Sequence, residues 1–260
     1  MGFFIVKNNS FIALTKKWSY NKLSKDGKNM KKQIRFYISL LLELIVFLSS
    51  TIGIIISISI SGDQFMGGKA TLLYFTIQSN MWIGLTSIFL FTIKLLEKYK
   101  KTSIIKKWMY VVKYVFTVSI TLTGSVYCLL LAPFLPEGYN AWSIANVLTH
   151  VIVPICSVAD IFVDEYKFLI TKKMTILTLT PPLYYLIFVL IGYALDFTYC
   201  NGENYPYFFL NFRSNAGFFG FVKEPLEIGS FYWLMLMIGI VLGIAFIYRF
   251  VFNKINKEDK

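Results

Sequence analysis

Residues 146–160 read NVLTHVIVPICSVAD, and this apolar run holds the only histidine of the chain, His150. An ionisable group at bilayer depth is costly, so it usually faces a protein interior or a wet cavity and marks a functional site. Asn146 shares a helix face with His150 because four residues separate them. Pro154 has no N–H to give to the carbonyl oxygen of His150, so we expect a kink at the histidine. The alternative is a buried histidine whose hydrogen bonds are satisfied by a neighbouring helix.

The rest of the chain is also strongly hydrophobic. Of its 260 residues, 56% are hydrophobic, and the mean hydropathy of +0.60 is too high for an ordinary soluble domain. The formal net charge is +12. The lysines stand between apolar spans and not in patches interleaved with aromatic residues, so they indicate orientation in a membrane and not nucleic-acid binding. The early apolar patches, 3–6 and 11–14, are too short for a signal peptide.

Six apolar stretches follow one another, each longer than the roughly twenty residues that cross a bilayer. All Lys and Arg residues except Lys69, Arg213 and Lys223 lie on one side, in or beside the two tails and two connectors. The positive-inside rule therefore puts both termini in the cytoplasm. The sequence predicts an all-α polytopic protein of the plasma membrane with six transmembrane helices, at 36–60, 71–95, 109–131, 141–163, 174–195 and 228–251. We expect a basic cytoplasmic tail at 1–35, the six-helix domain at 36–251 and a charged cytoplasmic tail at 252–260.

The second and fourth spans carry polar residues at matching depths. In this topology both helices enter from outside, with Thr76 about five residues and Asn80 about nine residues into the second span. Asn146 and His150 lie at about the same two depths in the fourth span. We expect the four side chains to meet in one cavity in the outer half of the bilayer.

This set of side chains can perform nucleophilic chemistry. A threonine hydroxyl needs an adjacent general base, and a neutral imidazole suits that role near pH 7. The amides of Asn80 and Asn146 would orient the ring or stabilise a developing oxyanion. The competing interpretation is packing, because Thr and Asn in membrane helices often hydrogen-bond across helices or to their own backbone.

Three segments strengthen the chemical interpretation: LLYFTIQSN at 72–80, NVLTHVIVP at 146–154 and YPYFFL at 205–210. Together they resemble the androgen-induced gene one family of six-span membrane proteins and its bacterial relatives, over roughly residues 36–251. The resemblance implies an intramembrane threonine hydrolase that cleaves esters of hydroxylated fatty acids, with Thr76 as nucleophile and His150 as its partner. The IQSN that follows Thr76 is of the bacterial type, where the animal proteins tend to carry an acidic residue. The substrate is therefore not carried over with the motifs.

We thus expect a lipid ester hydrolase that uses a Thr76–His150 dyad on a fatty-acyl ester near the outer leaflet, without a cofactor. With an alcohol or amine as acceptor, the same dyad would make a membrane acyltransferase. The alternatives from other classes are a non-enzymatic carrier or receptor for a lipid or small molecule, and a membrane protein whose polar face only packs. A metal site is not expected, because one histidine and no CxxC pair leave too few ligands. Nothing in the sequence specifies an oligomeric state.

Three further groups are interpreted structurally. Asp160 lies about 15 Å along the helix from His150, too far to orient the ring. We expect Asp160 and Glu43 to be acids at the cytoplasmic interface, with Glu43 also able to pair with a lysine. Cys128 and Cys200 fall near the same predicted membrane face, which allows a disulfide. The aromatic run 205–209 indicates an interfacial belt, and its alternative is a lid or acyl-chain gate over the site.

Overall fold

The computed structural model describes residues 5–59, 68–135, 139–164, 168–200, 202–224 and 226–258, with the side chains of α1 described from Asn29 onward. The expected loops at 61–70, 132–140 and 164–173 therefore lie partly outside the described residues. Helices dominate the structure. Two strands of two residues each, β1 (Phe221–Val222) and β2 (Glu227–Ile228), pair in an antiparallel hairpin. The α-helices are α1 (Ile5–Ser59), α2 (Phe75–Lys100), α3 (Lys107–Val126), α4 (Ile144–Val147), α5 (Val153–Val163), α6 (Lys172–Ile176), α7 (Thr180–Ala194) and α8 (Ser230–Glu258).

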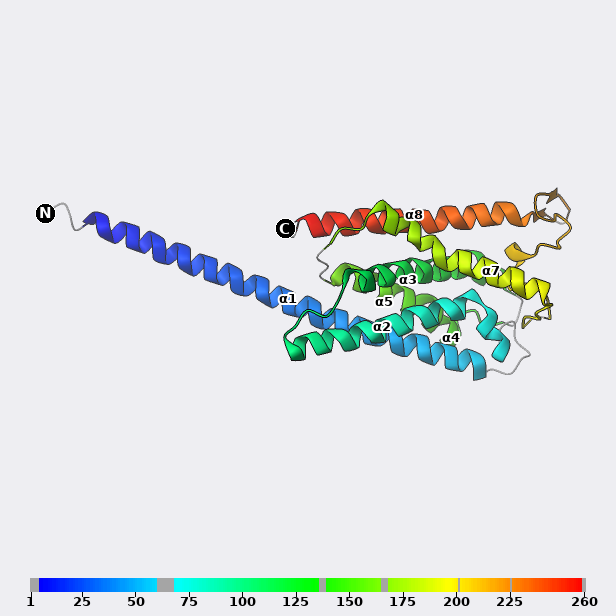
Figure 1. The fold of residues 1–260 in the computed structure, drawn as a ribbon, viewed down its shortest axis with the longest axis horizontal. Helices are drawn as coiled ribbons and strands as arrows, with labels where there is room; N and C mark the ends of the chain where they lie inside the picture. The colour runs from blue at the N-terminus through cyan, green and yellow to red at the C-terminus, as the bar shows by residue number, and fades with distance from the viewer. Residues whose placement is uncertain are drawn as a thin grey trace.

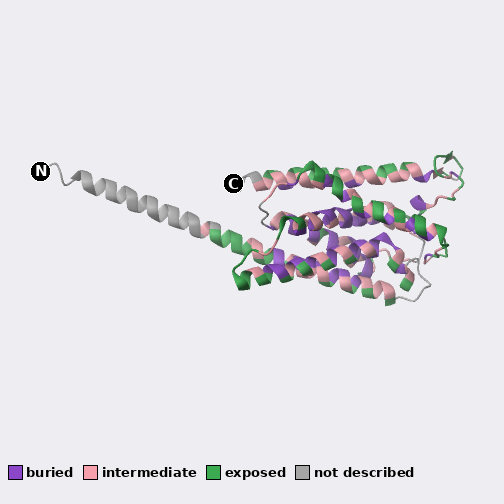
Figure 2. Cartoon of the chain, viewed as in Figure 1, coloured by how far each residue is buried: buried purple, intermediate pink, exposed green. Residues whose placement is uncertain are grey.

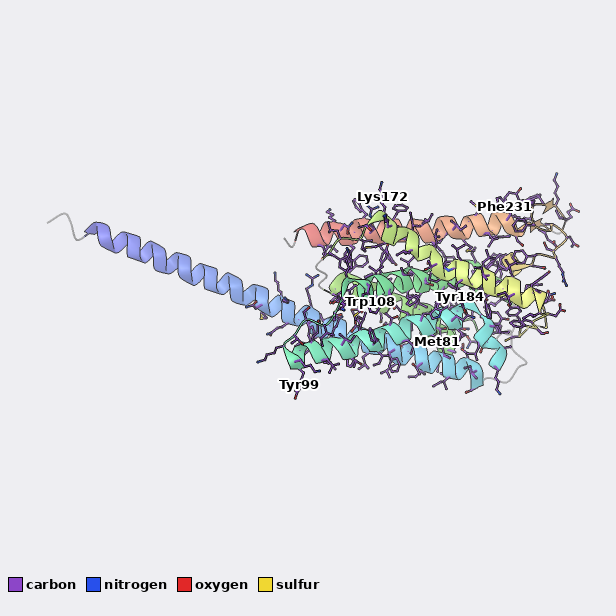
Figure 3. The ribbon with its side chains drawn as sticks, viewed as in Figure 1. Met81, Tyr99, Trp108, Lys172, Tyr184 and Phe231 are labelled. Atoms are coloured by element: carbon purple, nitrogen blue, oxygen red, sulfur yellow. The ribbon has the colours of Figure 1, made fainter. Side chains whose placement is uncertain are left out.

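The six apolar segments expected from the sequence are present as helices in the described part of the chain. Six helical segments are long and apolar enough to cross a bilayer, and they lie side by side (Figure 1). Large apolar side chains point away from this bundle, among them Met81, Trp108 and Tyr184 (Figure 3). So much exposed apolar surface is typical of a protein whose surroundings are lipid. The segments are Asn29–Ser59, Phe75–Lys100, Lys107–Phe134, Ile144–Val163, Lys172–Ala194 and Ser230–Asn256.

Two helix beginnings differ from the prediction. Helix α1 runs without a break from Ile5 into the first span, so no helix boundary separates the expected tail from the span (Figure 1). The helix carries no proline that would stop it. The second span starts later than expected. Residues Lys69–Leu73 form a 3₁₀ turn and Tyr74 is extended, so α2 begins at Phe75. Thr76 is therefore the second residue of its helix and not about the fifth, as the expected start at 71 implied.

The bundle has two parts. Helices α1, α2, α3 and α5 pack around one another, and α6, α7 and α8 pack on the α3 side. Buried residues concentrate between these helices (Figure 2). Small residues allow close approach inside the first part. A Cβ on Gly53 would lie 2.6 Å from Cγ2 of Thr149, and one on Gly84 would lie 2.2 Å from Oγ of Ser50.

The two ends of the bundle differ. The chain termini extend from the same end, which we call the tail end (Figure 1). The long segment between α7 and α8, residues 195–229, lies at the opposite end, which we call the loop end (Figure 1). This arrangement follows from an even number of crossings.

A buried group of charged side chains joins four helices near the tail end; we call it the ion network. The carboxylate of Glu43 accepts from both lysine ammonium groups at 2.8 Å. Lys113 Nζ lies 2.5 Å from Asp160, and Lys94 Nζ lies 2.6 Å from Asp164. The five members are at most 9% exposed: Glu43, Lys94, Lys113, Asp160 and Asp164.

The ion network corrects the expectation that Glu43 and Asp160 are acids at the interface. Both are buried, at 0% and 1% exposed. The lysine partner expected for Glu43 is present. The physical reason is that ions in a low-dielectric interior must be paired and hydrogen-bonded, and lysines on α2 and α3 reach these acids across the bundle. The sequence could not show that the four helices converge at one level.

The disulfide that the sequence allowed between Cys128 and Cys200 does not form. In the part of the chain that the structure describes, none of Cys128, Cys156 and Cys200 is joined in a disulfide. Cys200 lies beside Tyr74 at the start of α2, whereas Cys128 lines a groove with His150. The two thiols lie at the same end of the bundle but contact different residues.

Candidate active site

The start of α2 presents Thr76 at the loop end. The first amides of an α-helix have no intrahelical acceptor, and that of Thr76 lies 3.4 Å from the hydroxyl oxygen of Tyr207. The 3₁₀ turn and the extended Tyr74 bring the chain into this position. The side chain of Thr76 is 5% exposed, so it is buried at a helix end where backbone donors are also available.

His150 lies in a helix that is locally widened. Residues Leu148–Ile152 form a π-helical turn between α4 and α5, just before Pro154. The kink expected at the histidine is thus a π-turn, a feature frequent at functional sites. Gly124 of α3 packs directly against it, since a Cβ there would lie 2.7 Å from the carbonyl oxygen of His150.

The hydrogen bonds of His150 define which ring nitrogen is free. Its Nδ1 lies 3.1 Å from the backbone carbonyl oxygen of Asn146 and 3.0 Å from Oγ1 of Thr149. A carbonyl oxygen only accepts, so Nδ1 carries the proton and donates it. The neutral ring therefore presents the lone pair of Nε2, which is the form that a general base requires.

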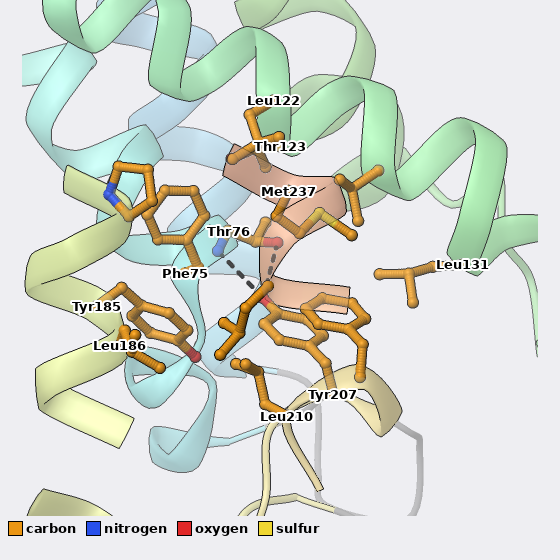
Figure 4. Close-up of a pocket in the computed structure, with 14 residues that line it drawn as sticks. Phe75, Thr76, Leu122, Thr123, Leu131, Tyr185, Leu186, Tyr207, Leu210 and Met237 are labelled. Atoms are coloured by element: carbon orange, nitrogen blue, oxygen red, sulfur yellow. Dashed lines mark hydrogen bonds between the residues drawn. The ribbon is translucent and has the colours of Figure 1, made fainter. Parts of the chain in front are cut away.

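The structure brings this lone pair to Thr76. Nε2 of His150 lies 3.4 Å from Oγ1 of Thr76. The Tyr207 hydroxyl lies 3.5 Å from the same oxygen, as Figure 4 shows. Both distances are at the long limit of a hydrogen bond, as is common in active sites without substrate. The three side chains form a row from Tyr207 through Thr76 to His150.

Tyr127 fixes the plane of the imidazole. Its ring stacks on His150 with 3.7 Å between centroids and 19° between planes. Its hydroxyl donates to the backbone carbonyl of Ala141. Tyr127 begins a second π-helical turn, Tyr127–Leu131, at the end of α3. Two widened turns therefore face each other at the histidine.

The two asparagines support the site from behind. The amide of Asn80 donates to the backbone carbonyl of Thr76 at 2.8 Å and to that of Thr149 at 3.2 Å, which ties α2 to the π-turn. The amide of Asn146 donates to the Tyr139 hydroxyl at 3.1 Å. Asn146 reaches the histidine through its backbone carbonyl, not its side chain. The four predicted residues lie in one region, with Thr76 lining a pocket and His150 a separate groove, and neither asparagine lines that pocket or that groove.

An apolar pocket opens beside Thr76. Its cavity volume is about 90 Å³, and α2, α3, α7, α8 and the loop segment form its walls (Figure 4). His150 instead lines an open groove between α3 and α5, together with Gly124, Cys128 and Pro154. The Thr76–His150 pair thus stands between two apolar openings.

The aromatic run of the loop folds inward. Tyr207, Phe209 and Leu210 are each at most 7% exposed and line the pocket. The interfacial-belt interpretation is therefore wrong for these residues, although Phe208 is half exposed. Burial, partly offset by hydrogen bonds from Thr76, raises the pKa of Tyr207 to about 12, so the phenol stays protonated near neutral pH. The contact between Tyr207 and Thr76 was not predicted from the sequence. The segment YPYFFL at 205–210 is the sequence feature that pointed to this part of the loop.

Among the described residues, the group of acids close enough together to hold a metal ion lies away from Thr76 and His150. Oxygens of Glu43, Asp160 and Asp164 lie within 4.8 Å of one another. Ammonium groups of Lys94 and Lys113 already lie at 2.5–2.8 Å from these acids. The group is therefore an ion-pair network at the tail end, far along the helices from His150.

Comparison with known proteins gives no match to a family model, a curated protein or a solved structure.

Proposed function

We propose that the chain is an intramembrane threonine esterase that cleaves a fatty-acyl ester. The observation that carries the proposal is the 3.4 Å approach of the basic Nε2 of His150 to the Thr76 hydroxyl, beside an apolar pocket in a membrane-spanning bundle. The resemblance of the Thr76, His150 and 205–210 segments to the androgen-induced gene one family supports the same activity.

In the first half-reaction the Thr76 hydroxyl attacks the ester carbonyl carbon while Nε2 of His150 takes its proton. The proton on Nδ1 remains bonded to the Asn146 carbonyl, which holds the ring in the correct tautomer. The tetrahedral intermediate then collapses. His150 returns the proton to the leaving alcohol, and the acyl group stays on Thr76.

The developing oxyanion needs donors beside Thr76. The protonated Tyr207 phenol and the Thr76 amide both lie there: the phenol oxygen is 3.5 Å from Oγ1 of Thr76 and 3.4 Å from the amide nitrogen of Thr76. The positive end of the α2 macrodipole adds to their effect. In the second half-reaction water attacks the acyl-threonine with His150 again as base, and a carboxylic acid leaves. An alcohol or amine in place of water would give acyl transfer.

Labelling with an activated fluorophosphonate tests the nucleophile. The purified protein should be labelled covalently at Thr76, because the base lowers the cost of forming the alkoxide. Labelling is read by in-gel fluorescence and located by mass spectrometry. The folded Thr76→Ala variant should lose it. Thr123→Ala is the matched control, because Thr123 lines the same pocket but bonds to Ser79 at 2.8 Å. Equal labelling of Thr76→Ala would contradict the proposal.

We further propose that the tail end faces the cytoplasm and the loop end faces outward, as the basic residues indicate. Single cysteines test this in a background without the three native ones. An impermeant maleimide added to intact cells should label Asn140→Cys and Glu224→Cys at the loop end. It should label Ser103→Cys and Lys254→Cys only after the cells are opened. All four positions are exposed. Labelling of Ser103→Cys in intact cells would reverse the orientation.

A further inference from the structure

The openings on both sides of the dyad share one chemical property. Of the residues that the structure describes, none that lines the pocket beside Thr76 is charged, and the groove beside His150 has no Lys, Arg, Asp or Glu in its walls. A charged group brought into either opening would lose its hydration without finding an ion partner. Such desolvation is costly.

The hydroxyl groups of the pocket are distributed unevenly. Tyr185 donates to the backbone carbonyl of Leu73 at 3.0 Å, and Thr123 is bonded to Ser79 at 2.8 Å. These two are therefore occupied by the protein. The hydroxyls of Thr76 and Tyr207, which bond only weakly to each other, remain for a ligand (Figure 4). The pocket thus offers one polar point in an otherwise apolar wall.

Aliphatic side chains make up much of the rest of the lining. Leu122 of α3, Leu186 of α7, Leu210 of the loop, and Leu234 and Met237 of α8 belong to it. An alkyl chain fits this lining because it has no polar atoms to satisfy, and its terminal carbonyl would meet Thr76 and Tyr207.

We infer that this pocket binds the alkyl chain of an uncharged lipid ester and that it selects esters of neutral alcohols over glycerophospholipids. The inference rests on the proposed function for the direction of the chain, with the carbonyl at Thr76. A phosphate near the ester would lie at one of the two uncharged openings, so its binding would be weakened.

Two matched photoreactive probes test the inference without requiring catalysis. One is an alkylglycerol ether that carries a diazirine in its chain, and the other is its phosphocholine derivative. Neither has an ester to cleave. After irradiation of the protein in nanodiscs, mass spectrometry should find the neutral probe on residues of the pocket at least tenfold more often than the phosphocholine probe.

Pocket-filling variants supply the control. Met237→Trp should reduce pocket crosslinking by the neutral probe at least fivefold, and Leu234→Trp serves if the first variant does not fold. Met235→Trp, on the exposed face of the same helix, should leave crosslinking unchanged. Equal crosslinking by both probes, or neutral crosslinks that persist in both filled variants, would overturn the inference. Failure of the esterase proposal is seen separately, as absent fluorophosphonate labelling.

Discussion

Thr76→Ala, His150→Ala and the double variant are expected to hydrolyse a long-chain fatty-acyl ester at one common low rate. That rate should lie roughly 10²- to 10⁴-fold below that of the unmodified protein, the usual contribution of a positioned proton-transfer group. The three variants should agree because neither residue acts without the other. Hydrolysis is measured with purified protein in detergent, as release of fatty acid.

Conservative variants separate chemistry from folding. Thr76→Ser keeps the hydroxyl and should retain measurable turnover. Tyr207→Phe removes one oxyanion donor and should lower turnover by about 10²-fold with little change in KM. Melting temperatures must be compared alongside, because loss of a buried polar group can itself unfold a protein. Full activity in folded Thr76→Ala would exclude the threonine mechanism.

Loss of one lysine from the ion network is expected to destabilise the bundle strongly. Lys113→Met removes the ammonium group that pairs with the carboxylate of Asp160. It also removes one of the two ammonium groups that pair with the carboxylate of Glu43. Breaking a buried pair by removing one partner typically costs about 3–5 kcal/mol, because an uncompensated charge remains in low dielectric. The free energy of unfolding is measured by denaturing-detergent titration in mixed micelles.

Lys98→Met is the matched control for this experiment. Lys98 is on α2, one turn beyond Lys94, but it lies at the surface against the ring of Tyr37. Its loss should cost no more than about 1 kcal/mol. The double variant Glu43→Gln, Lys113→Gln should be less destabilised than the sum of its single variants, because both charges leave together. Purely additive costs would show that the two residues do not act as a pair.

The ion network is a feature that could not be predicted from the sequence. Glu43 and Asp160 each stand in an apolar run with charged residues nearby in sequence, and that pattern suits an acid at the interface. Only the packing of α1, α2, α3 and α5 shows that lysines from two other helices meet them. Local sequence does not show that charged residues of four helices meet at one level of the bundle.

The inward fold of the loop is a second such case. Tyr and Phe near a membrane end favour headgroup depth, so the run 205–209 suited a belt. Tyr207 instead packs at 7% exposed against the start of α2, because the end of that helix offers amides and an aromatic surface. The contact spans 131 residues of chain.

The sequence by itself determined the six long apolar segments, because hydrophobic length and scarcity of charge are local properties that a bilayer selects directly. It also singled out Thr76 and His150 as polar residues within apolar helices. Tertiary structure decided how the two meet: the late start of α2, the π-turn at His150 and the role of Tyr207. These features depend on which helix surfaces approach closely, and small residues such as Gly53 and Gly124 permit that approach only where a partner of matching shape lies opposite.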